Sequence, residues 1–97
     1  MAPKKLLALR LMIDNPQGLF GSQFVHLSNG YLNRGTVYTL LERLVDEGFV
    51  KEVPVPPSAD LQLARTRHMI TAKGKRAYQA FLDEQGLARV PFATESA

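Results

Sequence analysis

The sequence predicts a small, mainly α domain of the α+β class, with the element order helix–helix–helix–strand–strand–helix. Three observations predict it. Residues 33–50 place apolar side chains at helical spacing up to a glycine, and then become rich in β-branched side chains. A shorter helical segment and a turn precede them, which is typical of a helix-turn-helix. A second strand-like segment and a last helical pattern follow them.

The chain is long enough for one hydrophobic core, which we expect to occupy residues 1–86 as a single domain. The absence of cysteine excludes disulfides and zinc-finger ligation, and fits a reducing cytosol. Residues 87–97 have few periodic apolar positions and a polar end, so we expect a flexible tail.

No segment predicts a membrane span or export. The longest apolar run, residues 6–13, is interrupted by Arg10 and is far shorter than the ~20 residues of a membrane helix. Lys4 and Lys5 before this run mimic the start of a signal peptide, but no small-residue cleavage site follows. We therefore expect a soluble, cytoplasmic protein.

The first helix is expected at residues 4–14, between Pro3 and the sequence Asn15-Pro16. It is apolar nearly all round, so it is either the central helix of a small core or a helix whose surplus face meets a second subunit. The second interpretation predicts a homodimer through the first and last helices. Its candidate interface residues are Leu6, Leu7, Leu11, Tyr78, Phe81 and Leu82.

The helix-turn-helix follows. Residues 19–27 form the predicted second helix, and Ser28-Asn29-Gly30 is a turn signal. Asn33 stands where an N-cap is needed, because its side-chain oxygen can accept a backbone N–H of the third helix. Gly48 ends that helix, since the residue after the last turn often needs a positive φ.

Two strands are expected at residues 49–55 and 65–71, joined by a loop at residues 58–64. On the second strand Thr66, His68 and Ile70 share one face, and Arg65, Arg67 and Met69 share the other. With Ile70 in the core, the arginines face outward. Thr71 then caps a last helix, residues 72–85, which Gly86 ends.

Residues 35–50, GTVYTLLERLVDEGFV, resemble the PadR family pattern of the recognition helix and first wing strand. A second match, Ile70-Thr71-x-x-Gly74, resembles that family's junction between the last wing strand and the following helix. The resemblance covers roughly residues 4–85. It implies a winged helix-turn-helix with three helices, a two-stranded wing and a C-terminal helix. It also implies a transcriptional regulator, expected to repress by occupying promoter DNA, in a bacterial, phage or plasmid setting.

A helix that enters the major groove reads bases from its N-terminal half. Arginine bonds guanine in a bidentate way, and a threonine methyl can meet the thymine methyl. Acids at Glu42, Asp46 and Glu47 would repel phosphate, so only the first two turns are expected deep in a groove. The base-reading candidates on the outward face are Arg34, Thr36, Thr39 and Arg43.

The phosphate-binding candidates come from an acid-free segment, residues 65–76, whose cations are Arg65, Arg67, Lys73, Lys75 and Arg76. Several of them oppose the dipole of the last helix, which an anionic partner would relieve; a solvated basic face is the alternative. Tyr38 is added because the resemblance implies a tyrosine near the DNA backbone; a half-buried core tyrosine is the alternative. The wing tip, residues 56–60, has no cation, so we expect phosphate contacts from the strand bases instead.

No catalytic, metal or cofactor site is predicted. His26 and His68 lie in different elements without a neighbouring nucleophile or acid cluster. The expected partners are double-stranded DNA and a second copy of the chain. One alternative is a winged-helix module that docks a protein, which salt dependence of DNA binding would separate. Another is a plasmid or phage accessory protein that binds DNA for partition or packaging.

Overall fold

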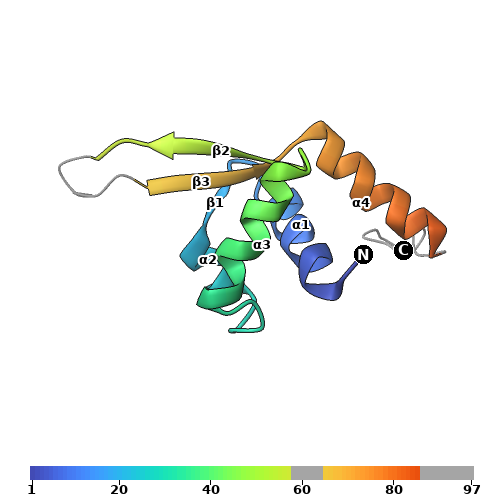
Figure 1. Cartoon of the computed structure of the whole chain (residues 1–97), viewed down its shortest axis with the longest axis horizontal. Helices are drawn as coiled ribbons and strands as arrows, with labels where there is room; N and C mark the ends of the chain where they lie inside the picture. The colour runs from blue at the N-terminus through green and yellow to red at the C-terminus, as the bar shows by residue number, and fades with distance from the viewer. Residues whose placement is uncertain (58–64, 86–97) are drawn as a thin grey trace.

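The computed structural model describes residues 1–57 and 65–85, so the predicted loop at 58–64, Gly86 and the tail at 87–97 lie outside the described residues. The elements, in chain order, are α1 (Pro3–Asp14), β1 (Leu19–Phe20), α2 (Gly21–Leu27), α3 (Arg34–Asp46), β2 (Val50–Val55), β3 (Arg65–Ile70) and α4 (Ala72–Glu84). In Figure 1, β2 and β3 extend to one side of the first three helices, and α4 extends to the other. The predicted winged helix-turn-helix is confirmed.

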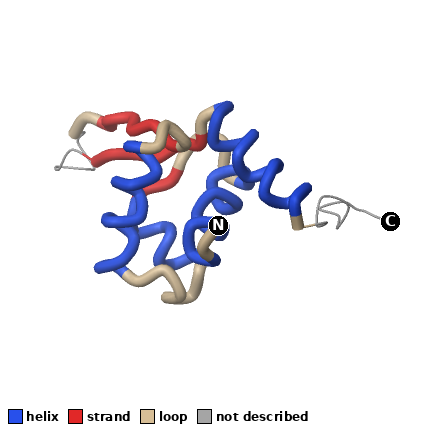
Figure 2. Tube along the Cα trace, turned by 45° about the vertical axis from the view of Figure 1, so that its right-hand side comes forward, coloured by secondary structure: helices blue, strands red, loops and turns tan. Residues whose placement is uncertain are grey.

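The sheet has three antiparallel strands in the order β1-β3-β2 rather than the two of the predicted wing. Leu19 pairs with His68 and Phe20 with Arg67, while Val50 on β2 pairs with Ile70. Figure 2 shows the three strands gathered at one end of the helices.

The prediction that residues 19 and 20 begin the second helix is therefore wrong. Phe20 has an extended backbone and is the N-cap of α2, because its N–H donates to the side-chain oxygen of Gln23 at 2.7 Å. That bond satisfies an N–H that the helix would otherwise leave unpaired, as in a capping box. The helix begins only at Gly21, and Leu19 is free to bond β3 and enter the core.

The two ends of α3 follow the predicted signals. The side-chain oxygen of Asn33 accepts the N–H of Thr36 at 2.9 Å, and α3 starts at Arg34, the residue after Asn33. Gly48, with φ of 79°, turns the chain out of α3 toward β2. In the described ranges, no helix is long and apolar enough to cross a membrane.

The core lies where α1, α2 and α3 meet the inner face of the sheet, and α4 closes it from one side. From α3 it includes Val37, Leu41 and Leu44, with Leu40 and Val45 partly buried beside them. The buried apolar residues are Ala8, Leu9, Met12, Leu19, Phe24, Leu32, Val37, Leu41, Leu44, Val50, Ile70, Tyr78 and Leu82.

A compact junction joins α3, the wing and α4. The Thr71 hydroxyl donates to the carbonyl of Gly48 at 2.7 Å and accepts the N–H of Gly74 at 3.0 Å. The Thr71 N–H also donates to the carbonyl of Phe49 at 2.9 Å. Gly74 packs directly on that Phe49 carbonyl, where a Cβ would have no room. This lack of room explains why the sequence has a glycine three residues after Thr71.

Candidate nucleic-acid interface

The N-terminal half of α3 presents an exposed polar face. Arg34, Gly35 and Thr39 are exposed, and Thr36 is half-buried. Because Asn33 caps the helix, the first turn is fixed without using these side chains. The acids Glu42 and Asp46 are exposed further along the helix. Only the first two turns therefore combine exposure with freedom from negative charge.

Tyr38 lies on the side of α3 that meets α2. A Cβ on Gly21 would lie 2.6 Å from Cε1 of the Tyr38 ring, so the ring crosses the start of α2 where only glycine leaves room. The ring is packed on this side, yet 55% of the residue is exposed. Tyr38 is therefore a surface residue rather than a core tyrosine.

The two wing arginines stack on a side chain that the sequence did not connect with them. The guanidinium carbons of Arg65 and Arg67 lie 3.8 and 5.2 Å from the centre of the Phe20 ring. Arg65 also places Nη2 3.4 Å from the hydroxyl oxygen of Ser22, on α2. Phe20 pairs with Arg67 across the sheet, so β1 brings the aromatic ring to the outer face of the wing.

These side chains surround a polar depression of about 280 Å³ between the first residues of β3, α2 and α3. Tyr38 and Arg65 both line it, so the structure brings together one residue from the central helix and one from the basic segment. The remaining lining residues are Phe20, Gly21, Ser22, Thr66 and His68. Hydroxyl and guanidinium donors around such a depression suit a phosphate oxygen.

The basic segment is not one surface. Lys73 lies against Gly48, with its ammonium 5.7 Å from the centre of the Phe49 ring, at the C-terminal end of α3. Lys75 lines a cleft between α1 and α4, and Arg76 is exposed on α4. Of the five cations, only Arg65 and Arg67 lie beside the start of α2. The strand–helix corner at Thr71 separates the two groups.

His68 is packed rather than exposed. It is buried on the core face of β3, with Nε2 3.6 Å from Oε2 of Glu52 on β2. Burial lowers the pKa of His68 below 6.5, and the nearby Glu52 carboxylate opposes this shift. Across the described residues, no three His, Cys, Asp or Glu side chains are grouped as metal ligands would be.

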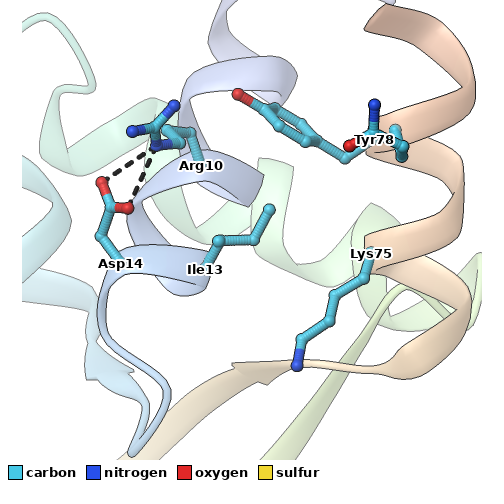
Figure 3. Close-up of a pocket in the computed structure, with 6 residues that line it drawn as sticks. Arg10, Ile13, Asp14, Lys75 and Tyr78 are labelled. Atoms are coloured by element: carbon cyan, nitrogen blue, oxygen red, sulfur yellow. Dashed lines mark hydrogen bonds and ion pairs between the residues drawn. The ribbon is translucent and has the colours of Figure 1, made fainter. Parts of the chain in front are cut away.

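The residues predicted for a dimer interface divide into two groups. Tyr78 and Leu82 are buried within the chain, so they have little surface left for a second copy. The partly buried ones, which pack on the edge of the core, are Leu6, Leu7, Leu11 and Phe81. Between α1 and α4 lies a mostly apolar cleft of about 340 Å³. Figure 3 shows Ile13, Tyr78 and Lys75 around it, with Arg10 bonded to Asp14 at its edge.

A groove that sequence analysis missed runs between the start of α1 and the other side of α3. It has a volume of about 380 Å³. The lining residues are Ala2, Lys4, Lys5, Gly35, Thr36, Thr39, Leu40 and Arg43. Thr36 and Arg43 therefore face α1, whereas Tyr38 faces α2. The sequence showed Lys4 and Lys5, but nothing in it placed them beside α3.

Comparison with known proteins identifies the fold. No protein-family profile and no curated protein sequence matches the chain. A mutant of S. aureus MepR superposes with a TM-score of 0.67 and 18% identity, over 98% of this chain and 68% of that one. Bacillus subtilis PadR in complex with operator DNA superposes with a TM-score of 0.67 and 20% identity, over 96% of this chain and 52% of that one. The chain thus spans about half the length of PadR, and it has the winged helix-turn-helix fold of both proteins.

Proposed function

We propose that the protein is a sequence-specific, double-stranded DNA-binding transcriptional regulator that represses by occupying promoter DNA. The observation that supports this most is the exposed, acid-free N-terminal half of α3, flanked by Tyr38 and Arg65. A helix of this kind enters a major groove with its first turns toward the bases. The similarity of fold to PadR, whose structure contains operator DNA, supports the same proposal.

In this proposal base reading belongs to α3. Arg34 and Thr39 are exposed on the first two turns and offer a guanidinium for guanine and a methyl for thymine. Thr36 and Arg43 line the groove beside α1, so they would contact the DNA at the edge of the helix rather than at its centre.

Backbone binding belongs to the first half of β3, the end of the strand remote from the Thr71 corner. Arg65 and Arg67 are held by stacking on Phe20, which lowers the entropy that each guanidinium loses when it bonds a phosphate. Tyr38 adds a hydroxyl at the same depression. Lys73 and Lys75 are left out of the proposed contact surface, because they lie on the far side of the Thr71 corner.

A salt titration with random duplex DNA tests the proposal. The affinity must fall linearly with salt on logarithmic axes, with a slope of about 0.9 per phosphate contact. The double variant Arg65→Ala/Arg67→Ala should lower that slope by the equivalent of about two phosphate contacts. Lys73→Ala/Lys75→Ala removes the same charge elsewhere and should leave the slope near that of the unmodified protein. Affinity without salt dependence would exclude DNA as the partner.

Specificity needs its own measurement. Selection of bound fragments from random DNA should return a common sequence motif if α3 reads bases. A set of bound fragments without a motif would exclude sequence-specific regulation and leave a general DNA-binding role.

We also propose that the protein binds DNA as a homodimer, paired through α1 and α4. Leu7, Leu11 and Phe81 on these helices are only partly buried, and a mostly apolar cleft lies between the two helices. A two-fold pair would present two α3 helices to sites about 34 Å apart, and would raise affinity through effective concentration. Sedimentation equilibrium at micromolar concentration tests this. A mass that stays near 10.8 kDa with and without DNA would exclude the dimer.

A protein-docking function is the second candidate, favoured by exposed apolar side chains on α2, the following turn and α3. Leu27, Tyr31 and Tyr38 are each about half exposed. A docked protein would contact these side chains with little dependence on salt, whereas a DNA backbone would contact the cations. The salt titration therefore separates the two candidates.

A further inference from the structure

Lys4 and Tyr31 form a pair at the start of α3 that the proposed function does not use. The ammonium of Lys4 lies 5.6 Å from the centre of the Tyr31 ring, within the range of a cation–π contact. Tyr31 belongs to the turn before α3, and 52% of it is exposed. Lys4 belongs to the first turn of α1. Elements far apart in sequence thus meet beside the end of α3 that is proposed to enter DNA.

The pair adjoins the groove on the α1 side of α3, which Lys4 itself lines together with Thr36, Thr39 and Arg43. Lys5 lines the groove too, but its ammonium is 2.6 Å from a carboxylate oxygen of Glu47. Lys4 and Arg43 make no salt bridge within residues 1–57 and 65–85. The groove therefore has two cations not neutralised by a carboxylate there.

The groove and the depression at Tyr38 flank α3 on opposite sides. On a helix of 100° per residue, Thr36 and Tyr38 lie about 160° apart, with Thr39 between them on the outward face. A major groove is about 12 Å wide, so a helix inside it has one phosphate backbone on each side. If α3 enters the groove as proposed, Tyr38 and the first residues of β3 would face one backbone, and the start of α1 would face the other.

We propose that Lys4 and Tyr31, together with Arg43 in the same groove, form a second backbone-binding site. This site would contact the DNA strand opposite to the one held by Arg65. This inference rests on the proposed function and extends it to α1. The cations match a polyanion, and the groove is continuous with the base-reading face through Thr36 and Thr39. A tyrosine beside a lysine suits a sugar–phosphate chain, because its ring covers the sugar and its hydroxyl bonds the phosphate.

The test compares Lys4→Ala with Lys73→Ala in salt titrations against random duplex DNA. Both variants remove one positive charge, but Lys73 lies beside Gly48 and Phe49 and does not line the groove. Lys4→Ala should lower the salt slope by about 0.9, so that its affinity falls about 3.5-fold less than that of the unmodified protein between 50 and 200 mM salt. Lys73→Ala should keep the full slope. Tyr31→Phe should weaken binding to all sequences, while Tyr31→Ala should weaken it further.

The possible results separate this inference from the function on which it rests. If the unmodified protein binds DNA with a steep salt slope and Lys4→Ala retains that slope, the second site is excluded and the proposed function stands. The groove would then belong to another occupant, such as an acidic segment of a protein. If the unmodified protein shows no salt-dependent binding, both proposals are excluded. Equal melting temperatures of the variants confirm that a changed slope reflects contact and not folding.

Discussion

The ring of Tyr38 lies against the Cα of Gly21, so that a Cβ on Gly21 would approach the ring's hydroxyl oxygen to 2.7 Å. Gly21 is the first residue of α2 and Tyr38 lies in the second turn of α3, so this contact sets the lateral position of the tyrosine. Because the ring is largely exposed, it can move aside when a side chain is added. We therefore expect this contact to affect the position of Tyr38 on the surface more than the stability of the core.

Gly21→Ala should weaken DNA binding with little change in stability. The new methyl displaces the Tyr38 ring, which removes one hydrogen bond to phosphate and costs roughly tenfold in affinity. The free energy of unfolding should change by less than about 1 kcal/mol, since alanine favours the helix. Titration with a fluorescent duplex and thermal melting measure the two effects. In a Tyr38→Ala background Gly21→Ala should have no further effect; an undiminished second loss would contradict the mechanism.

If α3 reads bases, substitutions on its outward face should alter which DNA sequences the protein prefers. Arg34→Ala and Thr39→Ala should each cost about 1–3 kcal/mol on the preferred sequence and much less on random DNA. The relevant measurement is the ratio of the two affinities at one salt concentration. Glu42→Ala, on the same helix but beyond the first two turns, serves as the control and should retain the preference. If all three variants kept the sequence preference of the unmodified protein, specificity would lie outside α3.

Gly74→Ala should be strongly destabilising. Its Cβ would overlap the Phe49 carbonyl, which is backbone and cannot rotate away, and would approach a side-chain carbon of Ile70 to 2.7 Å. Overpacking of this kind costs about 1–3 kcal/mol or more. Gly35→Ala is the matched control, because its Cβ would meet only the Asn33 side-chain oxygen at 3.6 Å. Chemical denaturation measures both, and equal stabilities would show that α4 shifts without cost.

His68 should make stability depend on pH. Its folded-state pKa is lowered by burial, so the unfolded chain binds a proton more readily than the folded one. Stability is therefore greatest above the unfolded value of 6.5 and falls as the pH drops through it toward the lower folded pKa. Denaturation between about pH 7.5 and 5.5 measures the slope. His68→Gln should flatten it, whereas His26→Gln, at an exposed position, should not.

The sequence predicted the elements whose signals are local. The caps at Asn33 and Thr71 and the positive φ of Gly48 depend on neighbouring residues, and all three occur as expected. Strand β1 has only two residues, and its pairing with β3 spans almost fifty positions, so no local pattern showed it. For the same reason the stacking of Arg65 on Phe20 was not predictable.

Charge patterns were the least informative about the site. An unbroken basic segment appeared to be one surface, but the turn at Thr71 changes the direction of the chain between Arg67 and Lys73. Conversely, Lys4 lies near α3 only because α1 packs beside it. The sequence shows how many charges a segment carries, but the fold determines which of them lie close enough together to contact one partner.

The bonds of Thr71 also have a mechanical consequence. They bind the end of α3, the base of β2 and the start of α4 at one corner, and Gly74 closes that corner without a gap. Because these contacts leave no empty space, we expect the corner to move as one unit. A partner that tilts α4 is then expected to turn β3 as well, which would change the distance between the wing arginines and α3.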